Sequence, residues 1–209
     1  MSHTTGIRQA QKRKTRQALL DAALALLEEQ SLSSLGLREV TRAVGVAPTA
    51  FYRHFRDTAD LGVALVEEAL GSLHGTIVST LAATGERDSD QRIAGAVELI
   101  DRLVREHPAH VRFLARERHG GVRPVRDAIG DQLDRFADEV ADELARLPEA
   151  AGWARDDLLM LARLYVDLMV STASAFLAAG PDSGARARVA GEARRRLRLV
   201  VLGSRHWLD

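Results

Sequence analysis

The segment 37–55 constrains the fold of this chain more than any other part of the sequence. Apolar side chains at spacings of three and four predict that it begins as a short helix with one buried face: Leu37, Val40 and Val44. Gly45 follows, where a residue without a Cβ most easily takes the left-handed conformation that ends a helix. Pro48 stands where a second helix takes its first turn, a position that tolerates proline. The segment therefore predicts two helices joined by a tight turn.

The second helix of this pair combines an apolar anchor with a polar outer surface. Phe51 and Phe55 are four residues apart, so they share one face and are expected to be buried. The other faces carry hydrogen-bond donors and an aromatic ring: Thr49, Tyr52, Arg53 and His54. Two helices arranged in this way are typical of a helix-turn-helix, whose second helix enters the major groove of DNA.

The charge of the chain is distributed as a DNA-binding protein requires, although its net value is zero. Residues 1–56 contain nine Lys or Arg and four Asp or Glu, which gives a net charge of +5. The remainder contains twenty basic and twenty-five acidic residues, which gives −5. The positive charge needed to neutralise DNA phosphates is thus confined to one end of the chain.

The sequence Val-Gly-Val-Ala-Pro-Thr-Ala-Phe-Tyr-Arg-His-Phe of residues 44–55 resembles the recognition segment of TetR-type repressors. Within that family it is similar to the FabR-like branch, the repressors of unsaturated fatty-acid synthesis. Three further segments carry this resemblance: Leu61-Gly62, residues 113–118 and residues 197–207. TetR-type proteins usually have Ser or Thr where Gly36 stands, so one hydroxyl that contacts phosphate is expected to be missing.

The resemblance implies an all-α homodimer that represses transcription from a palindromic operator. Residues 12–57 would form the helix-turn-helix DNA-binding domain, and residues 58–209 the ligand-binding and dimerisation domain. The implied effector is a long-chain acyl thioester such as an acyl-CoA, and the implied targets are genes of fatty-acid or lipid metabolism. The alternative is a repressor of an efflux or catabolic gene that responds to a small aromatic or drug-like ligand.

The residues predicted to contact DNA lie in the helix-turn-helix or just before it: Lys12, Lys14, Arg16, Arg38, Arg42, Pro48, Thr49, Tyr52, Arg53 and His54. Most of them also have a simpler interpretation. The basic residues before the motif can form a solvated helix end, and Thr49 can cap a helix. Tyr52 and His54 can be a half-buried aromatic and an ordinary surface residue. Arg38 and Arg42 can pair with Glu39 or another carboxylate.

The rest of the sequence predicts an all-α chain of about nine helices. Good helix formers dominate, and strand-type alternation is hard to find. A helix is expected to begin at about Lys12, after a polar and disordered segment 1–11. The helix expected at about 156–179 carries only Arg163 and Asp167 as charges after Leu158. A helix that is apolar on nearly all sides must be covered on nearly all sides, which favours a second subunit as its cover.

An effector pocket is expected among the large side chains of the C-terminal body: Phe113, Arg116, Phe136, Tyr165, Met169 and Phe176. For the apolar members of this set the alternative is ordinary core packing. Arg116 is a candidate for an acidic head group, and its alternative is an ion pair with a neighbouring carboxylate.

The composition argues against several other classes of protein. The chain has no cysteine, so it has no disulfide, no thiol nucleophile and no Cys-ligated zinc. His107 and His110 are separated by Pro108, which argues against a shared metal-binding face, and no common catalytic motif is present. No uncharged apolar stretch spans a membrane and no apolar signal core opens the chain, which favours a cytoplasmic protein. The sequence thus predicts neither an enzyme nor a cofactor. The alternative to a DNA-binding regulator is an enzyme or scaffold that uses helix-turn-helix packing for another purpose.

Overall fold

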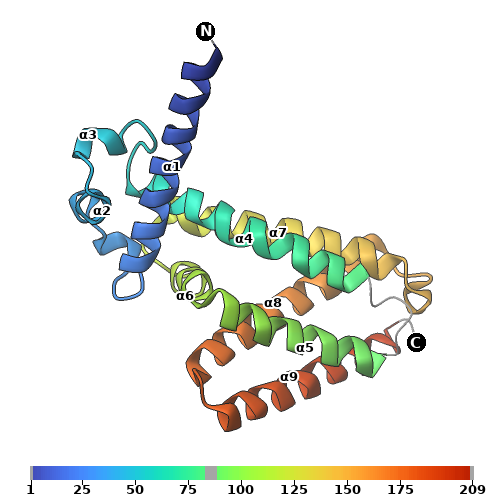
Figure 1. The fold of residues 1–209 in the computed structure, drawn as a ribbon. Helices are drawn as coiled ribbons and strands as arrows, with labels where there is room; N and C mark the ends of the chain where they lie inside the picture. The colour runs from blue at the N-terminus through green and yellow to red at the C-terminus, as the bar shows by residue number, and fades with distance from the viewer. Residues whose placement is uncertain (1, 83–88, 208–209) are drawn as a thin grey trace. The chain divides into compact units, whose positions relative to one another are not determined.

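The computed structural model describes the backbone of residues 2–82 and 89–207, and the side chains of residues 8–71 and 89–207. Within these ranges the protein is all-α, with nine α-helices and no strand, as the sequence predicts (Figure 1). The helices are α1 (Ser2–Leu26), α2 (Leu37–Val44), α3 (Pro48–Phe51), α4 (Thr58–Ala82), α5 (Ser89–Glu106), α6 (Pro108–Glu117), α7 (Arg123–Ala145), α8 (Arg155–Ala179) and α9 (Ser183–Ser204). Two short 3-10 helices, Leu32–Ser34 and Pro148–Ala150, lie in connecting segments.

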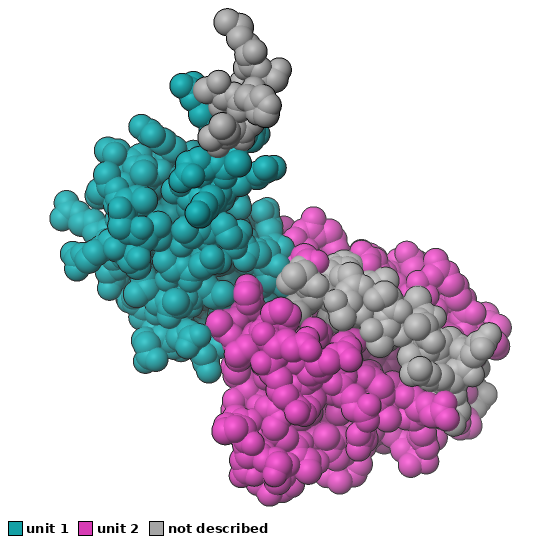
Figure 2. All heavy atoms as spheres, viewed as in Figure 1, with its two compact units in different colours: residues 1–69, 112–129 teal, residues 70–111, 130–209 magenta. Residues whose placement is uncertain are grey.

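The chain divides into two compact units, which are coloured separately in Figure 2. Unit 1 contains Met1–Ala69 together with Arg112–Ile129, and unit 2 contains Leu70–Val111 together with Gly130–Asp209. Unit 1 thus holds the whole predicted helix-turn-helix domain and also the segment that joins α6 to α7. Because residues more than forty positions further along the chain belong to this unit, its stability depends on them as well as on its own helices.

The core of unit 1 is built on the buried face of α1, with Leu19, Leu20 and Ala23 fully buried. The helix begins at Ser2 and not at about Lys12, so the expectation of a disordered segment 1–11 is wrong. Residues 2–11 contain no proline and include good helix formers such as Gln and Arg, which allows the helix to extend beyond its packed part.

The Leu61-Gly62 pair of α4 has a packing role in unit 1. A Cβ added at Gly62 would lie 2.5 Å from a methyl of Leu32 and 2.8 Å from a methyl of Val125. Both distances are too short for carbon atoms, so glycine is what allows α4 to approach the connector after α1 and the start of α7. The apolar Leu61 beside it is fully buried.

Unit 2 is held by helices α5, α8 and α9, which contact one another pairwise. The apolar stripe Ile93, Val97, Ile100 and Val104 of α5 packs with Phe176 and Leu197 in one buried cluster. A second cluster joins α7 to α8. The clean spacing of three and four in α5, visible in the sequence, is therefore the spacing of a core-facing helix.

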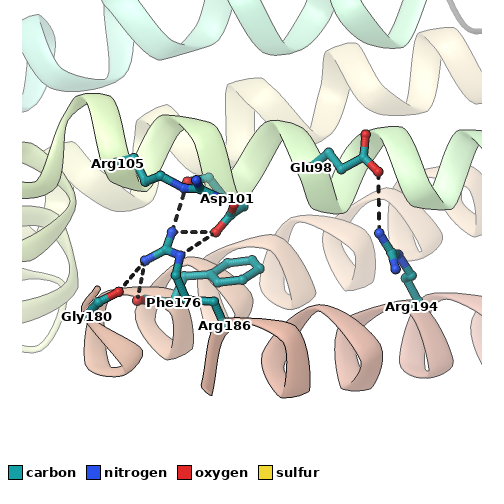
Figure 3. Close-up of polar contacts among 7 residues, drawn as sticks. All are labelled: Glu98, Asp101, Arg105, Phe176, Gly180, Arg186 and Arg194. Carbon is teal, nitrogen blue, oxygen red and sulfur yellow. Dashed lines mark hydrogen bonds and ion pairs between the residues drawn. The ribbon is translucent and has the colours of Figure 1, made fainter. Parts of the chain in front are cut away.

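A partly buried ion pair joins α5 and α9 near the end of α8 (Figure 3). Arg186 of α9 donates from Nε to Oδ1 of Asp101 on α5 at 2.8 Å and from Nη1 to the carbonyl of Gly180 at 2.7 Å. Its guanidinium also lies 5.1 Å from the ring centroid of Phe176. The two side chains are only 12% and 17% exposed, so their attraction is little screened by water.

Candidate nucleic-acid interface

Helix α2 has the ends that its sequence predicts. Gly36 is its N-cap, and the amide of this glycine donates to Glu39 Oε2 at 3.1 Å. Gly45 ends the helix with φ 73° and ψ 29°, the left-handed conformation that glycine adopts most easily. The sharp turn that follows leads directly into α3, so the geometry of a helix-turn-helix is in place.

Helix α3 is short but firmly anchored. Regular α-helix covers only Pro48–Phe51, and the chain continues helically as His54 and Phe55 donate to the carbonyl of Phe51 at 2.8 and 3.0 Å. Phe51 and Phe55 are buried, with ring centroids 5.5 Å apart. The predicted apolar anchor is confirmed, and it fixes the orientation of the residues between its two members.

The outward face of α3 is free for contact. Tyr52 is 63% exposed, the largest exposed fraction of any aromatic side chain among the described residues. Its ring meets that of Phe51 edge-on at 5.9 Å, which holds it without burying it. Pro48, Thr49 and Arg53 are also exposed. A large, half-polar side chain held rigidly in water costs little further entropy when it meets a partner.

His54 lies where the basic residues of α1 and α3 converge. It is half-buried, and its Nδ1 has no hydrogen-bond partner among the described residues. Burial lowers the pKa of His54, and the positive charges of Lys12, Arg16 and Arg53 lower it further. Burial and the nearby cations thus disfavour protonation of His54, and the positive potential at this point suits an approaching phosphate.

The remaining predicted DNA contacts are exposed cations without carboxylate partners. Lys12, Lys14, Arg38 and Arg42 form no ion pair with any described side chain. Glu39, the suggested partner of the two arginines, instead accepts hydrogen bonds from Gly36 and Gln30. Arg16 is also exposed, with its guanidinium 5.2 Å from the ring centroid of Phe55. These cations are available to an anionic partner.

The end of α6 holds the connector between α1 and α2, a contact that the sequence did not suggest. Arg116 donates to the backbone carbonyls of Leu27 at 2.9 Å and Gln30 at 2.5 Å. Glu117 is 1% exposed, and its Oε1 accepts from the amide of Leu32 at 2.9 Å. Arg116 thus binds carbonyls just beyond the C-terminal end of α1, where the helix dipole favours a cation.

The other predicted ligand residues are mostly core. Phe113 in unit 1 and Phe136 and Phe176 in unit 2 are buried, and Met169 packs against both clusters of unit 2. Tyr165 lines a cavity of about 60 Å³ in unit 2. A ligand-binding role for these residues stays a prediction. No group of three His, Asp or Glu side chains suited to a metal ion occurs in the part of the chain that the structure describes.

Replacing Lys12 and Lys14 with alanine is expected to flatten the salt dependence of DNA binding. Each lysine that neutralises a phosphate releases counterions, so log affinity falls linearly with log salt concentration. The slope should decrease by about one for each lysine removed. Fluorescence anisotropy titrations at graded salt measure it, with Arg123→Ala as the control because that exposed arginine pairs with Asp127 outside the motif. An unchanged slope would show that neither lysine contacts a DNA phosphate.

Comparison with known proteins agrees with this geometry. Residues 19–65 match the model of the bacterial regulatory proteins of the tetR family. The chain is similar to the fatty acid degradation regulator FadR from Bacillus halodurans, with TM-score 0.68, 15% identity and coverage of 87% of this chain and 93% of that one. It is also similar to FadR from Bacillus subtilis in complex with stearoyl-CoA, with TM-score 0.67, 13% identity and coverage of 87% and 96%.

A third similar structure is reduced NemR from E. coli, with TM-score 0.63, 20% identity and coverage of 89% and 96%. At these identities the three structures show a shared fold, which extends over both units. The family of the matched segment consists of transcriptional regulators, not enzymes.

Proposed function

We propose that this chain is a TetR-type transcriptional repressor, homodimeric and cytoplasmic, that binds a palindromic operator. Residues 12–57 form its DNA-binding domain, and residues 58–209 bind the effector and the second subunit. The observation that carries the proposal is the segment anchored by Phe51 and Phe55, which exposes Tyr52 and Arg53 beside His54, a residue that the charges of Lys12 and Arg16 also reach. Two such helices related by a two-fold axis read half-sites about one DNA turn apart.

The homodimer is supported by the apolar surface of α8 and α9. Met160 and Leu164 on α8 are 47% and 46% exposed, and Leu199 and Leu202 on α9 are 72% and 49% exposed. The most apolar 18-residue window of α8 has mean hydropathy 1.4 and is only 28% buried. Length and composition alone would let α8 cross a membrane, but the exposed apolar side chains continue onto the arginine-rich α9. A second copy of the chain covers both helices.

Tyr52→Phe tests the placement of the recognition helix. The change deletes one exposed hydroxyl and leaves the ring contact with Phe51 intact, so folding should be nearly unaffected. A lost hydrogen bond to a phosphate weakens binding by about 1–3 kcal/mol. Fluorescence anisotropy with a duplex from the gene's own upstream region measures this loss of affinity. The control is Ser33→Ala, which removes an exposed hydroxyl from the connector before α2 and should not change the affinity. Wild-type affinity in Tyr52→Phe would place the DNA contact elsewhere.

The proposed effector is a long-chain acyl thioester, and the proposed targets are genes of unsaturated fatty-acid or other lipid metabolism. Support comes from the resemblance of the recognition segment and from the stearoyl-CoA complex of a protein that shares the fold. Burial of a long chain at about 0.8 kcal/mol per methylene provides ample binding energy before ordering costs. The ligand changes DNA affinity by its differential affinity for the two states of the dimer.

Titrating the operator complex with acyl-CoAs of graded length tests the effector. Long-chain thioesters should change operator affinity measurably, whereas short-chain thioesters and free CoA should not. Either an increase or a decrease in operator affinity with long-chain thioesters agrees with the proposal. A flat response at every length, with a strong response to an aromatic or drug-like compound, would favour the repressor of an efflux or catabolic gene.

A further inference from the structure

A small cavity in unit 2 lies where α5, α7, α8 and α9 meet, and neither the fold nor the proposed DNA contacts account for it. Its volume is about 60 Å³. Its apolar wall consists mainly of aliphatic side chains and one indole: Leu144, Leu147, Ala150, Trp153, Leu158, Leu161 and Val201. A second hollow of about 200 Å³ shares Ser89, Val201 and Arg205 with it. The two form one site with an apolar end and a wider mouth.

The polar groups of this site are mostly hydrogen-bond donors. Arg92 and Arg205 line the cavity beside the carboxylate of Glu149, and the wider hollow adds Arg198, which pairs with Asp90 at 3.5 Å. Arg92 pairs with Glu149 at 3.3 Å. Arg205 donates to the hydroxyl of Ser89 at 2.9 Å and forms no ion pair with a described carboxylate. The two hollows together hold three arginines and two carboxylates, so the site carries one excess positive charge, although Arg205 also attracts Glu149.

Tyr165 adds a third donor from the side of α8. Its ring packs on the α5–α8–α9 cluster, and its hydroxyl has no hydrogen-bond partner among the described residues. Burial raises the pKa of Tyr165, so its phenol stays protonated and can donate. This donor faces the cavity, so a ligand acceptor there would take the place of water as its partner.

We propose that this cavity binds a small organic carboxylate, with its carboxyl group at Arg205 and Tyr165 and its apolar part against Trp153 and the leucines. A carboxylate matches a guanidinium and a phenol because it only accepts hydrogen bonds. The cavity is far smaller than the roughly 150 Å³ that holds a benzene ring. It therefore suits a short aliphatic chain rather than an aromatic ring, and the mouth leaves room for the carboxyl group.

This inference does not rest on the proposed repressor function, because it concerns binding to the protein without DNA. Both tryptophans of the chain report on the site. Trp153 lines the cavity, and the ring of Trp207 lies 6.1 Å from it between centroids. Trp207→Phe leaves Trp153 as the sole indole, so a fluorescence change in this variant arises at the cavity.

The test is a fluorescence titration of Trp207→Phe with acetate, butyrate and hexanoate at constant ionic strength. The signal should saturate, and each methylene that enters the cavity should tighten binding about four-fold until the cavity is full. Butanol and hexanol, which lack the charge, should bind at least about ten-fold more weakly. Equal curves for acids and alcohols, or no saturation with any of them, would overturn the proposal.

Two variants in the Trp207→Phe background locate the carboxyl group. Arg205→Gln should weaken butyrate binding about ten-fold or more, whereas Arg194→Gln, on the same helix but outside the cavity, should not change it. Val201→Phe fills the cavity and should weaken butyrate and butanol alike. Circular dichroism confirms that each variant is folded. Unchanged butyrate affinity in folded Arg205→Gln would overturn the proposal. Operator binding is measured separately in the absence of butyrate, so a failure of the carboxylate site can be distinguished from a failure of the repressor function.

Discussion

Leu164→Asp is expected to convert the protein into a monomer that no longer holds its operator. Leu164 lies on α8, is 46% exposed and belongs to the apolar surface that we assign to the second subunit. Burying an unpaired carboxylate in such an interface costs several kcal/mol, and a two-fold interface contains the change twice. A monomer has only one DNA-binding domain. It therefore loses the gain in operator affinity that bivalent binding provides, which amounts to orders of magnitude.

Sedimentation velocity and operator titration measure the two effects on the same sample. Ala145→Asp is the matched control, since it adds an equal charge at an exposed position at the end of α7, away from this surface. The control should remain a dimer with wild-type operator affinity. A stable dimer of Leu164→Asp would place the subunit interface elsewhere on the molecule.

Asp101→Ala is expected to destabilise unit 2 strongly. The substitution leaves Arg186 buried at 12% exposure without its carboxylate partner, although the carbonyls of Phe176 and Gly180 still accept from it. Removal of one partner of a buried pair costs about 2–4 kcal/mol after allowance for those carbonyls. In a chain of this size that corresponds to a decrease of roughly 5–15 °C in Tm.

Thermal unfolding at fixed protein concentration measures this change, because a dimer's Tm depends on concentration. Glu98→Ala is the matched control on the same helix (Figure 3). Glu98 is 71% exposed and pairs with Arg194 at 3.4 Å, so its loss should have little effect. Similar Tm values for the two variants would show that the Asp101–Arg186 pair does not hold α5 and α9 together.

The parts of the fold that the sequence predicted are those with a local signal. Of the three apolar residues predicted to form the buried face of α2, Val40 is buried, whereas Leu37 and Val44 are half-buried. The predicted end of the helix at Gly45 is confirmed. The spacing of Phe51 and Phe55 likewise identifies the buried side of the recognition helix. Propensity and periodicity act over a few residues, so these elements can be derived from a single sequence.

The contacts that join distant segments could not be predicted in the same way. Arg116 suggested a ligand contact or an ion pair with a neighbouring carboxylate, yet it and Glu117 hold the backbone of residues 27–32. Asp101 and Arg186 are 85 residues apart, and no local pattern indicates that they meet. Arg92 and Arg205 became a candidate site only when the structure placed them at one cavity. Such pairings depend on how the helices pack, which spacing along the chain does not specify.

The most direct test of the proposed function compares the protein's affinity for its own upstream DNA with its affinity for a shuffled duplex of equal length. Both titrations are made at one physiological salt concentration, because the phosphate contribution is common to both duplexes. A sequence-reading regulator should bind a palindromic segment of the upstream region at least about a thousand-fold more tightly. Equal affinity for the two duplexes, or no binding to either, would contradict the assignment of α3 as a helix that reads an operator in that region.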